Sequence, residues 1–415
     1  MDQPTQAAVF CGGIGTRLRP LTDTLPKPMA PIHDGKPFLH FLLDQLSEQG
    51  IHRFVLMTGY LADVITDYFG DGSQWGWDIT YSRGPVEWDT GRRLWEARAL
   101  LDERFLLLYS DNFAQFSLPS ALSHHQRSNA AITLMVKNKA SGNVSLGAGG
   151  ALERYESSRK GEGLDHVELG YMIVERKVVF SAFEELGASR DISFSEVIRH
   201  LVAKGMVQGY ELQTPYYSIS DLDRLALMRK HLSPRRLLLI DRDGTLHHRA
   251  PRGEYIRRAE DMRFLPEAIA GLKRLATAGF NFIVISNQAG IGRGAVTQDE
   301  VDAVNAAICE ELKREGVKIL AFYVCPHHWI DECSCRKPRP GLFFRCAADF
   351  DLRLDRVLYV GDDPRDLEAA DAAGCGGLYV GDADELRASR FHDRRIYSSI
   401  NEATEDIISA YTASE

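Results

Sequence analysis

Short apolar segments alternate with segments of helical periodicity along almost the whole chain, and they form two separate patterns, one in each half. In the first half we predict strands at 7–11, 54–58, 105–109 and 131–136, and helices at 37–49, 92–101 and 195–204. Such alternation is typical of α/β folds with a largely parallel sheet. The chain has 415 residues, which is more than one hydrophobic core usually supports, so we expect two domains.

A segment that contains a proline marks the expected boundary between the domains. The predicted helix at 221–232 is followed by Ser233-Pro234-Arg235-Arg236, which does not easily continue a helix. A second α/β pattern then begins at Leu237, with predicted strands at 237–241, 281–286, 319–324, 357–360 and 377–380, and predicted helices at 266–278, 298–315, 342–350 and 364–373. We therefore expect domains at 1–232 and 237–385, a linker at 233–236, and a polar tail at 386–415 with room for one more helix at 399–411.

Composition and charge argue against several classes of protein. The net charge of -9 does not suggest a nucleic-acid-binding protein. No apolar window approaches the length of a membrane span, and the first residues do not resemble a secretory signal. The seven cysteines are an odd number, which argues against a disulfide framework. We expect a cytoplasmic protein that acts on small molecules.

Two aspartates directly follow an apolar strand in the second half. The run 237–240 leads into Asp241-Arg242-Asp243-Gly244-Thr245. A strand end brings Asp241 and Asp243 to the edge of the sheet where ligand sites of α/β folds form, and residues two apart point to the same side. One such carboxylate could attack phosphorus while the other transfers a proton, or both could hold a cation. An acidic turn without a function would show the same residues, so further segments must support this interpretation.

Three later segments carry groups that suit a phosphate. The second strand of this half ends at Ser286-Asn287, whose hydroxyl and amide could bind phosphate oxygens. Lys337 offers a point charge for the phosphate. The strand at 357–360 leads into Gly361-Asp362-Asp363, and Asp362 would join Asp241 in holding Mg²⁺ through hard oxygen ligands.

These four motifs, in this order, resemble the haloacid dehalogenase phosphatase family over residues 237–380. The resemblance implies that Asp241 becomes phosphorylated, and that Asp243 protonates the leaving alcohol and then activates water. It implies that Lys337 and Mg²⁺ offset the charge on the transferring phosphoryl group. It also implies that Asp241, Asp362 and the backbone carbonyl of Asp243 bind Mg²⁺.

Three cysteines and a histidine lie close together just before Lys337. Cys325, His327, Cys333 and Cys335 form the pattern C-x-H-x5-C-x-C. Three thiolates and one imidazole meet the tetrahedral demand of a structural Zn²⁺. The adjacent His328 remains an alternative ligand. Because the loop leads directly to Lys337, we expect the ion to position this lysine indirectly and to have no chemical role.

The zinc-like loop is similar to that of two groups within the family, the D-glycero-D-manno-heptose 1,7-bisphosphate 7-phosphatases and the histidinol-phosphate phosphatases. Its short spacing is as in the histidinol enzymes, whereas the stretches 253–266 and 286–294 look more like the heptose enzymes. By analogy with the latter, Arg293 and Arg336 would hold the distant phosphate of the substrate. The loop length leaves the identity of the substrate open.

A glycine-rich string follows the first predicted strand of the chain. It runs Gly12-Gly13-Ile14-Gly15-Thr16-Arg17 and continues to Pro26-Lys27-Pro28. Glycines let backbone N–H groups approach phosphate oxygens closely. Arg17 and Lys27 add positive charge for a triphosphate and its pyrophosphate product. A tight turn would explain the glycines alone, but it does not explain the whole string GGxGTRLxPxTxxxPKPM.

This string resembles the sugar-1-phosphate nucleotidyltransferases, and the resemblance covers about residues 6–232. It implies a Rossmann-like fold in which a sugar 1-phosphate attacks the α-phosphorus of a nucleoside triphosphate and pyrophosphate leaves. The protein then supplies positioning and charge neutralisation. Roles at the active site are implied for the phosphate-binding Gly12, Gly13, Gly15 and Thr16, for Arg17 and Lys27, for Asp111 as Mg²⁺ ligand, and for Glu168, Gly170 and Tyr171 near the sugar.

Two departures from this family pattern affect the expected activity. Thr90-Gly91 is followed by Arg92-Arg93, so side chains stand where the family has small residues beside the nucleobase. Ser218 stands where the family carries a second metal-binding aspartate, and Asp221 is a nearby substitute. A domain that binds without turnover is therefore an alternative.

The two resemblances together suggest consecutive reactions. A heptose 1,7-bisphosphate must lose its 7-phosphate before its 1-phosphate can receive a nucleotide, so both domains would serve one route to a nucleotide-activated heptose. Family resemblance favours guanine as the base. The alternative is a phosphatase for histidinol phosphate or another small phosphate monoester, with a non-catalytic N-terminal domain that binds nucleotide or sugar.

Overall fold

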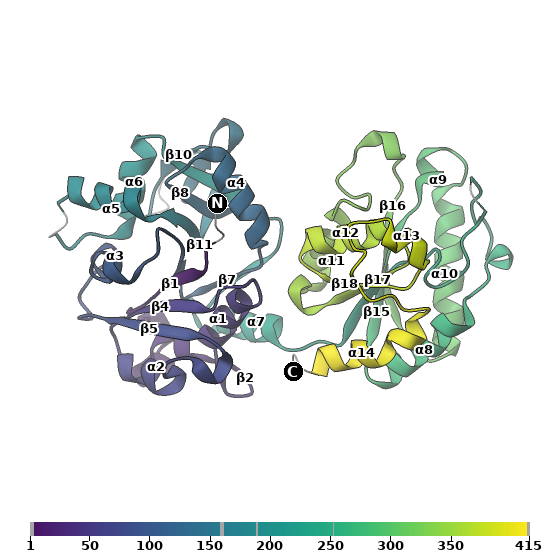
Figure 1. The fold of residues 1–415 in the computed structure, drawn as a ribbon, viewed down its shortest axis with the longest axis horizontal. Helices are drawn as coiled ribbons and strands as arrows, with labels where there is room; N and C mark the ends of the chain where they lie inside the picture. The colour runs from purple at the N-terminus through teal and green to yellow at the C-terminus, as the bar shows by residue number, and fades with distance from the viewer. Residues whose placement is uncertain (1–3, 158–161, 188–189, 252, 413–415) are drawn as a thin grey trace. The chain divides into compact units, whose positions relative to one another are not determined.

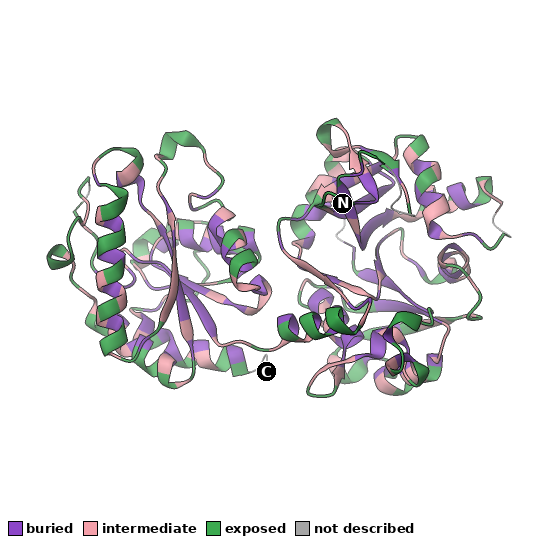
Figure 2. Ribbon diagram, turned by 180° about the vertical axis from the view of Figure 1, so that it is seen from behind, coloured by how far each residue is buried: buried purple, intermediate pink, exposed green. Residues whose placement is uncertain are grey.

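The computed structural model describes residues 4–157, 162–187, 190–251 and 253–412 (Figure 1). The chain divides into two compact units, Met1–Ser233 and Pro234–Glu415, and each is described by itself. None of the described helices combines the length and the apolar character needed to cross a membrane. Figure 2 shows the strands of both large sheets coloured mainly as buried and the outer faces of their helices as exposed.

The first unit is built on a mixed sheet with the strand order β10-β9-β11-β6-β1-β4-β5, in which β8 pairs with β11 and β12 pairs with β8. Its strands are β1 (Gln6–Cys11), β4 (Arg53–Thr58), β5 (Asp78–Arg83), β6 (Arg104–Tyr109), β8 (Ile132–Asn138), β9 (Val144–Leu146), β10 (Leu152–Tyr155), β11 (His166–Glu175) and β12 (Val207–Glu211). The central strands β6, β1, β4 and β5 are mutually parallel, so their carboxyl ends meet at one edge.

Helices cover both faces of this sheet. They are α1 (Phe38–Ser47), α2 (Ala62–Phe69), α3 (Thr90–Ala97), α4 (Leu118–Ser128), α5 (Arg176–Glu185), α6 (Phe194–Ala203) and α7 (Leu222–Leu232). Because side chains alternate along a strand, Ala7 and Val9 of β1 join a core with α1, whereas Ala8 and Phe10 join a core with α3, α5 and α6. Two small antiparallel pairs, β2 (Pro31–His33) with β3 (Lys36–Pro37) and β7 (Asn112–Ala114) with β13 (Tyr216–Ser218), complete the unit.

The second unit contains a parallel sheet of five strands in the order β16-β15-β14-β17-β18. The strands are β14 (Leu237–Ile240), β15 (Asn281–Asn287), β16 (Ile319–Cys325), β17 (Leu358–Gly361) and β18 (Gly376–Tyr379). The helices are α8 (Pro266–Thr277), α9 (Ala289–Gly292), α10 (Gln298–Arg314), α11 (Gly341–Phe350), α12 (Pro364–Ala373), α13 (Ala383–Arg387) and α14 (Ile400–Thr412). Leu238 and Ile240 pack with α8, α10 and α14, and Leu239 packs on the opposite face with α11 and α12.

The last helix, α14, belongs to the core of the second unit. Ile400 and Ile407 are buried in the same cluster as Leu272 of α8. The Tyr411 hydroxyl donates a hydrogen bond to the carbonyl of Leu237, and it accepts one from the backbone N–H of Leu358 at 3.0 Å. Residues near the end of the chain therefore hold the beginnings of two central strands, β14 and β17.

Candidate functional sites

Three neighbouring strands of the second unit end at one group of polar side chains. Asp241 directly follows β14, Ser286 and Asn287 are the last residues of β15, and Asp362 directly follows β17. Because β14 lies between the other two strands and all are parallel, these residues come together at the same edge. Asp241, Ser286 and Asn287 line a cavity of about 210 Å³. Its lining residues are Asp241, Asp243, Arg249, Ser286, Asn287, Arg336, Lys337, Asp363, Arg365 and Asp366.

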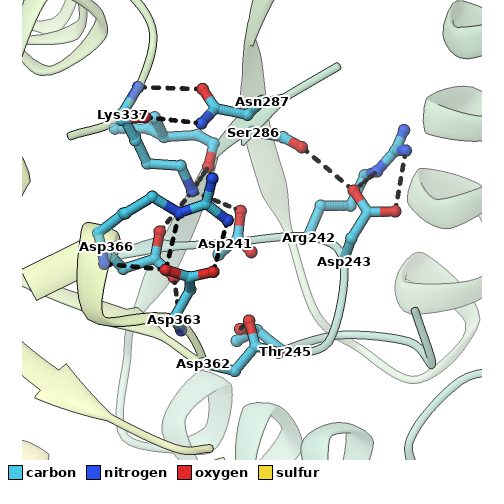
Figure 3. Close-up of polar contacts among 12 residues, drawn as sticks. Asp241, Arg242, Asp243, Thr245, Ser286, Asn287, Lys337, Asp362, Asp363 and Asp366 are labelled. Atoms are coloured by element: carbon cyan, nitrogen blue, oxygen red, sulfur yellow. Dashed lines mark hydrogen bonds and ion pairs between the residues drawn. The ribbon is translucent and has the colours of Figure 1, made fainter. Parts of the chain in front are cut away.

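Lys337 is the buried cation at the centre of this group (Figure 3). Its Nζ lies 2.6 Å from Asp241 Oδ1 and 2.7 Å from Asp366 Oδ1, and it donates to the Tyr359 hydroxyl at 2.6 Å. The backbone of Lys337 is fixed by the amide of Asn287, which both accepts from its N–H and donates to its carbonyl at 3.1 Å. The loop before α11 is thereby fastened to the end of β15.

The carboxylates of Asp241, Asp362 and Asp366 form a compact, buried cluster in which ligand atoms lie within 4.8 Å of one another. Burial raises the pKa of Asp241 to about 8, with further upward shifts from Asp366 and Asp362, although Lys337 opposes them. Burial also raises the pKa of Asp362 to about 6. A buried set of carboxylates with this excess negative charge has the hard oxygen donors that Mg²⁺ prefers, so the residues present fit a magnesium ion.

Asp366 was not among the ligands predicted from the sequence. It lies in the first turn of α12, where its carboxylate also accepts the backbone N–H of Asp363 at 3.1 Å in a capping box. The backbone carbonyl of Asp243, the predicted third ligand, accepts a hydrogen bond from Nε of Arg249 at 3.3 Å, and its role as a ligand stays a prediction. The same Nε is 2.9 Å from Asp362 Oδ2. Arg249 therefore shares the oxygens of this edge, and its loop position gave no signal in the sequence.

The carboxylate of Asp243 is turned toward Arg242 (Figure 3). Arg242 is 1% exposed and contacts both carboxylate oxygens, Nε to Oδ2 at 2.9 Å and Nη2 to Oδ1 at 3.2 Å. The amide of Gln288 and the hydroxyl of Ser286 donate to Oδ2 at 2.7 and 3.2 Å. Burial alone would raise the pKa of Asp243, but Arg242 and Gln288 hold it below its usual value.

This contact leads to a prediction about the pH dependence of phosphate release. A general acid must hold its proton when the leaving alcohol departs, so the rate falls as pH rises through its pKa. The substitution Arg242→Gln removes the cation that lowers the pKa of Asp243. We expect the alkaline limb of the pH profile for an alkyl phosphate to move upward by about one unit or more.

Two controls separate this effect from damage to the fold. Arg242→Lys keeps a positive charge beside Asp243 and should leave the limb close to that of the wild type. A nitrophenyl phosphate needs no proton on its leaving group, so its profile should not shift in Arg242→Gln. An unmoved limb in a variant with normal thermal unfolding would contradict the role of Asp243 as the acid.

The two arginines predicted to bind a distant phosphate lie in different surroundings. Arg336 lines the cavity beside Asp241, and its Nη1 is buried without a hydrogen-bond partner among the described residues. Arg293 follows α9 and contacts aromatic rings, lying 5.8 Å from the ring centre of Tyr255 and 5.2 Å from that of Trp329. Arg293 is not part of the cavity lining, whereas Arg365, which sequence reasoning did not select, is.

The four predicted zinc ligands converge on one point. Ligand atoms of Cys325, His327, Cys333 and Cys335 all lie within 4.8 Å of one another. The three Sγ–Sγ distances are 3.4 to 3.7 Å, and Nδ1 of His327 is 3.2 Å from Sγ of Cys335. A tetrahedral ion with Zn–S bonds of about 2.3 Å requires edges of about 3.8 Å, so the donor set fits Zn²⁺. The neighbouring His328 instead accepts the backbone N–H of Ile330 at 3.2 Å.

We expect metal analysis of the purified chain to find about one zinc per molecule. The double substitution Cys333→Ser and Cys335→Ser should remove it and lower the thermal stability of the second unit, because the loop loses its cross-link. Cys309→Ser is the matched control, since Cys309 lies on α10 outside the cluster. Retention of stoichiometric zinc by the double variant would contradict the assignment.

The glycine-rich string of the first unit lines a cavity of about 430 Å³ at the carboxyl ends of β1 and β6. One part of the lining comes from the glycine-rich string and the lysine that follows it. The rest comes from the segment before α3 and from the end of β6. The lining residues are Phe10, Cys11, Gly12, Gly13, Gly15, Lys27, Pro28, Val86, Glu87, Trp88, Asp89, Thr90, Arg93, Tyr109, Ser110 and Asp111.

Lys27 and Asp111 form an ion pair in this cavity, with Nζ 2.8 Å from Oδ2. Gly15 has a positive φ of 67°, and a Cβ there would lie 2.7 Å from Cβ of Lys27. Only glycine therefore suits this position, because another residue would be strained and would displace the lysine. The geometry brings together the predicted phosphate-binding loop, its lysine and the predicted metal ligand.

Other residues predicted for this site lie outside the cavity lining. Thr16 and Arg17 are exposed in a short 3-10 helix, Thr16–Leu18, next to Gly15. Glu168 and Gly170 lie on β11, where the pairing with β8 shifts register between Glu168 and Met172. Gly170 has a φ of 75° and packs against Tyr109, which does line the cavity.

The two departures from the family pattern also have structural outcomes. Ser218 pairs with Asn112 next to Asp111, and its hydroxyl accepts from Nη1 of Arg224 at 3.0 Å. Asp221 caps α7 by accepting the N–H of Arg224 at 2.9 Å. Arg92 lies over the Trp88 ring and pairs with Glu96, whereas Arg93 is buried. Arg93 is therefore packed into the wall of the cavity, where it is buried.

Comparison with known proteins assigns each unit to a class. The family described as Nucleotidyl transferase matches residues 6–149, and the family described as Polynucleotide kinase 3 phosphatase matches residues 236–393. The fold and the two sites define an enzyme with a nucleotidyltransferase domain and a magnesium-dependent phosphatase domain of the haloacid dehalogenase type.

Relatives of the second unit are more specific. The chain is 34% identical over 146 residues to the D-glycero-beta-D-manno-heptose-1,7-bisphosphate 7-phosphatase of Pseudomonas aeruginosa, covering 35% of this chain and 81% of that protein. It is 36% identical over 154 residues to the D-glycero-alpha-D-manno-heptose-1,7-bisphosphate 7-phosphatase of Mycobacterium bovis, covering 35% of this chain and 80% of that protein. The chain belongs, through its second unit, to the family of heptose-1,7-bisphosphate 7-phosphatases.

A solved structure matches the same unit. It is the D,D-heptose 1.7-bisphosphate phosphatase of B. bronchiseptica complexed with magnesium and phosphate. The match has 28% identity and a TM-score of 0.40, and it covers 42% of this chain and 98% of that one.

Proposed function

We propose that the chain carries out two consecutive steps in the activation of a heptose. The second unit removes the 7-phosphate from D-glycero-D-manno-heptose 1,7-bisphosphate, and the first unit transfers a nucleotidyl group, GMP from GTP, to the remaining 1-phosphate. The observation that carries this proposal is the presence of a heptose-bisphosphate 7-phosphatase domain and a nucleotidyltransferase domain in one chain. The product of the first reaction has the sugar 1-phosphate group that the second reaction consumes.

In the phosphatase reaction Asp241 is the nucleophile. Its carboxylate oxygen forms a bond to phosphorus while the bond from phosphorus to the sugar 7-oxygen breaks, and Asp243 donates a proton to that oxygen. Water then attacks the aspartyl-phosphate, Asp243 accepts its proton, and inorganic phosphate leaves. Lys337, 2.6 Å from Asp241, offsets the charge of the phosphoryl oxygens, and Ser286 and Asn287 hold them.

The remaining residues of this site have supporting roles. Mg²⁺ held by Asp241, Asp362 and Asp366 would supply further charge neutralisation at the phosphoryl group. Arg336 lines the cavity, and its buried Nη1 has no hydrogen-bond partner within the described part of the chain, so it is placed to hold the second phosphate of a bisphosphate. Cys325, His327, Cys333 and Cys335 would hold Zn²⁺, which would cross-link the loop that leads into Lys337.

In the nucleotidyl transfer an oxygen of the sugar 1-phosphate bonds to the α-phosphorus of the triphosphate. The bond from that phosphorus to the bridging oxygen breaks, and pyrophosphate leaves. Backbone N–H groups at Gly12, Gly13 and Gly15 are placed to bind phosphate oxygens, and Lys27 offsets their charge. Asp111 is the carboxylate at which Mg²⁺ would accompany the triphosphate.

A paired substrate screen of the purified full-length chain tests the proposal. Phosphate release is measured with both anomers of D-glycero-D-manno-heptose 1,7-bisphosphate and with histidinol phosphate. Pyrophosphate release is then measured with the heptose 1-phosphate that this reaction produces and with GTP, ATP, CTP or UTP. We expect one anomer to be preferred over histidinol phosphate by at least about 100-fold, since a site built for two phosphates leaves charged groups unpaired with the smaller ligand.

The outcomes of this screen distinguish the alternatives. Preference for histidinol phosphate, without pyrophosphate release from any triphosphate, would replace the proposal with a monoester phosphatase that carries a binding domain. Turnover of the heptose 1-phosphate with a triphosphate other than GTP would retain the two-step route and correct the base.

A further inference from the structure

Arg93 is a charged side chain buried beside the cavity of the first unit. It belongs to the first turns of α3, is 5% exposed, and contributes to the same cavity lining as Gly12 and Lys27. Burying a guanidinium is costly unless its N–H groups find acceptors. The acceptors of the hydrogen bonds from Arg93 therefore show which parts of the cavity wall this side chain holds.

The guanidinium binds the ends of two strands. Nη1 donates to the carbonyl of Thr58, the last residue of β4, at 2.8 Å. Nη2 donates to the carbonyls of Pro85 at 2.7 Å and Val86 at 3.3 Å, just after β5. Among the described residues these hydrogen bonds all go to backbone oxygens. Arg93 thus acts on the backbone, and Val86 is itself part of the cavity wall.

The same guanidinium lies directly behind two glycines. A Cβ at Gly12 would lie 2.3 Å from Cζ of Arg93, and a Cβ at Gly59 would lie 2.7 Å from Nη2. The carbonyl of Gly12 also accepts the N–H of Tyr60 at 3.2 Å. Arg93 therefore fills the space where the end of β1 meets the end of β4, and both glycines are needed to make room for it.

The base of the side chain is itself held in place. The hydroxyl of Thr90, at the start of α3, accepts the backbone N–H of Phe194 at 2.9 Å. A Cβ at Gly91 would lie 2.4 Å from the carbonyl of Ile192, so α3 packs closely against the segment before α6. Arg93 consequently connects a fixed helix to the ends of three parallel strands, β1, β4 and β5.

We infer that Arg93 is a positioning residue for the nucleoside triphosphate, because it holds the backbone at Gly12, Gly59 and Val86 in the shape that receives the nucleotide. This inference rests on the proposed nucleotidyl transfer at this cavity. Arg93 would thus support nucleotide binding by holding the backbone of the cavity, at a position where the sequence suggested that its side chain obstructs the nucleobase.

The test uses the full-length chain with the substitutions Arg93→Met, which removes the charge and the hydrogen bonds, and Arg93→Lys, which keeps a charge but cannot reach all three carbonyls. Arg98→Met is the matched control, since Arg98 packs on the ring of Trp95 and neither residue lines the cavity. Dissociation constants for GTP, the triphosphate of the proposed reaction, are measured by calorimetry, together with KM for the sugar 1-phosphate and thermal unfolding.

We expect both Arg93 variants to bind GTP about 10-fold to 100-fold more weakly, as hydrogen bonds of charged groups would allow, with KM for the sugar 1-phosphate changed less than the GTP constant. Arg98→Met should bind GTP nearly as well as the wild type. Normal GTP binding by Arg93→Met would overturn the inference, and so would full rescue by Arg93→Lys, since charge alone would then suffice. If the wild type did not bind GTP, the assignment of guanine as the base would be wrong, and the variants would be measured with whichever of ATP, CTP or UTP the wild type binds. If the wild type bound no triphosphate, both the proposed nucleotidyl transfer and the role of Arg93 would be overturned.

Discussion

Replacement of Asp241 by asparagine should abolish phosphate release and leave pyrophosphate release intact. The asparagine has the same shape as the aspartate and still lies next to Lys337, but its amide cannot form the bond to phosphorus. We expect a loss on the order of 10⁴-fold or more, as is typical when a nucleophile that acts with its partners is removed. Phosphate release from heptose 1,7-bisphosphate, followed by a colorimetric assay, measures the effect.

The control for this variant is Asp371→Asn, an exposed carboxylate on α12 in the same unit. It should retain wild-type phosphatase turnover. Pyrophosphate release by Asp241→Asn, assayed with a sugar 1-phosphate and a triphosphate, should also match the wild type. Loss of both activities in Asp241→Asn would contradict two independent sites, and residual turnover near that of the wild type would exclude Asp241 as the nucleophile.

The second large effect is expected for Lys27→Ala in the first unit. Lys27 is the cation that faces Asp111 across the glycine-rich cavity, and its removal leaves the phosphates without that charge. Loss of one preorganised electrostatic contact of this kind costs about 10²-fold to 10³-fold in rate. Pyrophosphate release should fall by this amount, whereas phosphate release should not change.

Lys36→Ala provides the comparison, because Lys36 lies in the hairpin of β2 and β3 outside the cavity lining. It should leave pyrophosphate release unaltered. If Lys27→Ala retained full nucleotidyl transfer, the glycine-rich cavity would not be the site of that reaction. If it lost phosphatase activity as well, the two sites would not be independent.

The parts of the sites that could be predicted are those set by strand ends. Asp241, Ser286 and Asp362 each follow or end an apolar run, and parallel pairing of β14 with its neighbours then brings them together. The cysteine–histidine cluster was equally accessible, because its four ligands lie within one short loop whose spacing can be read directly.

The residues that escaped prediction depend on packing across elements. Tyr359 reads as a core residue in the middle of β17, yet its hydroxyl reaches Lys337 at 2.6 Å. Asp366 becomes a candidate ligand only because α12 starts at Pro364 and turns its first carboxylate back toward the strand ends. The sequence places Arg93 at the cavity, but it does not show that two glycines without Cβ atoms make room for the guanidinium within the cavity wall.

The contact of Tyr411 with Leu237 and Leu358 has a consequence for synthesis of the chain. The hydrogen-bonded pair of Tyr411 and Leu237 is separated by 174 positions in sequence. Domains generally fold as units as they leave the ribosome, N-terminal ones first. All the described strands of the first unit are complete once residue 218 has emerged, whereas the second unit can bury the core that Ile400 and Ile407 share with Leu272 only after α14 has been made. We therefore expect a chain truncated before α14 to fold its first unit and to leave the second unit incompletely packed.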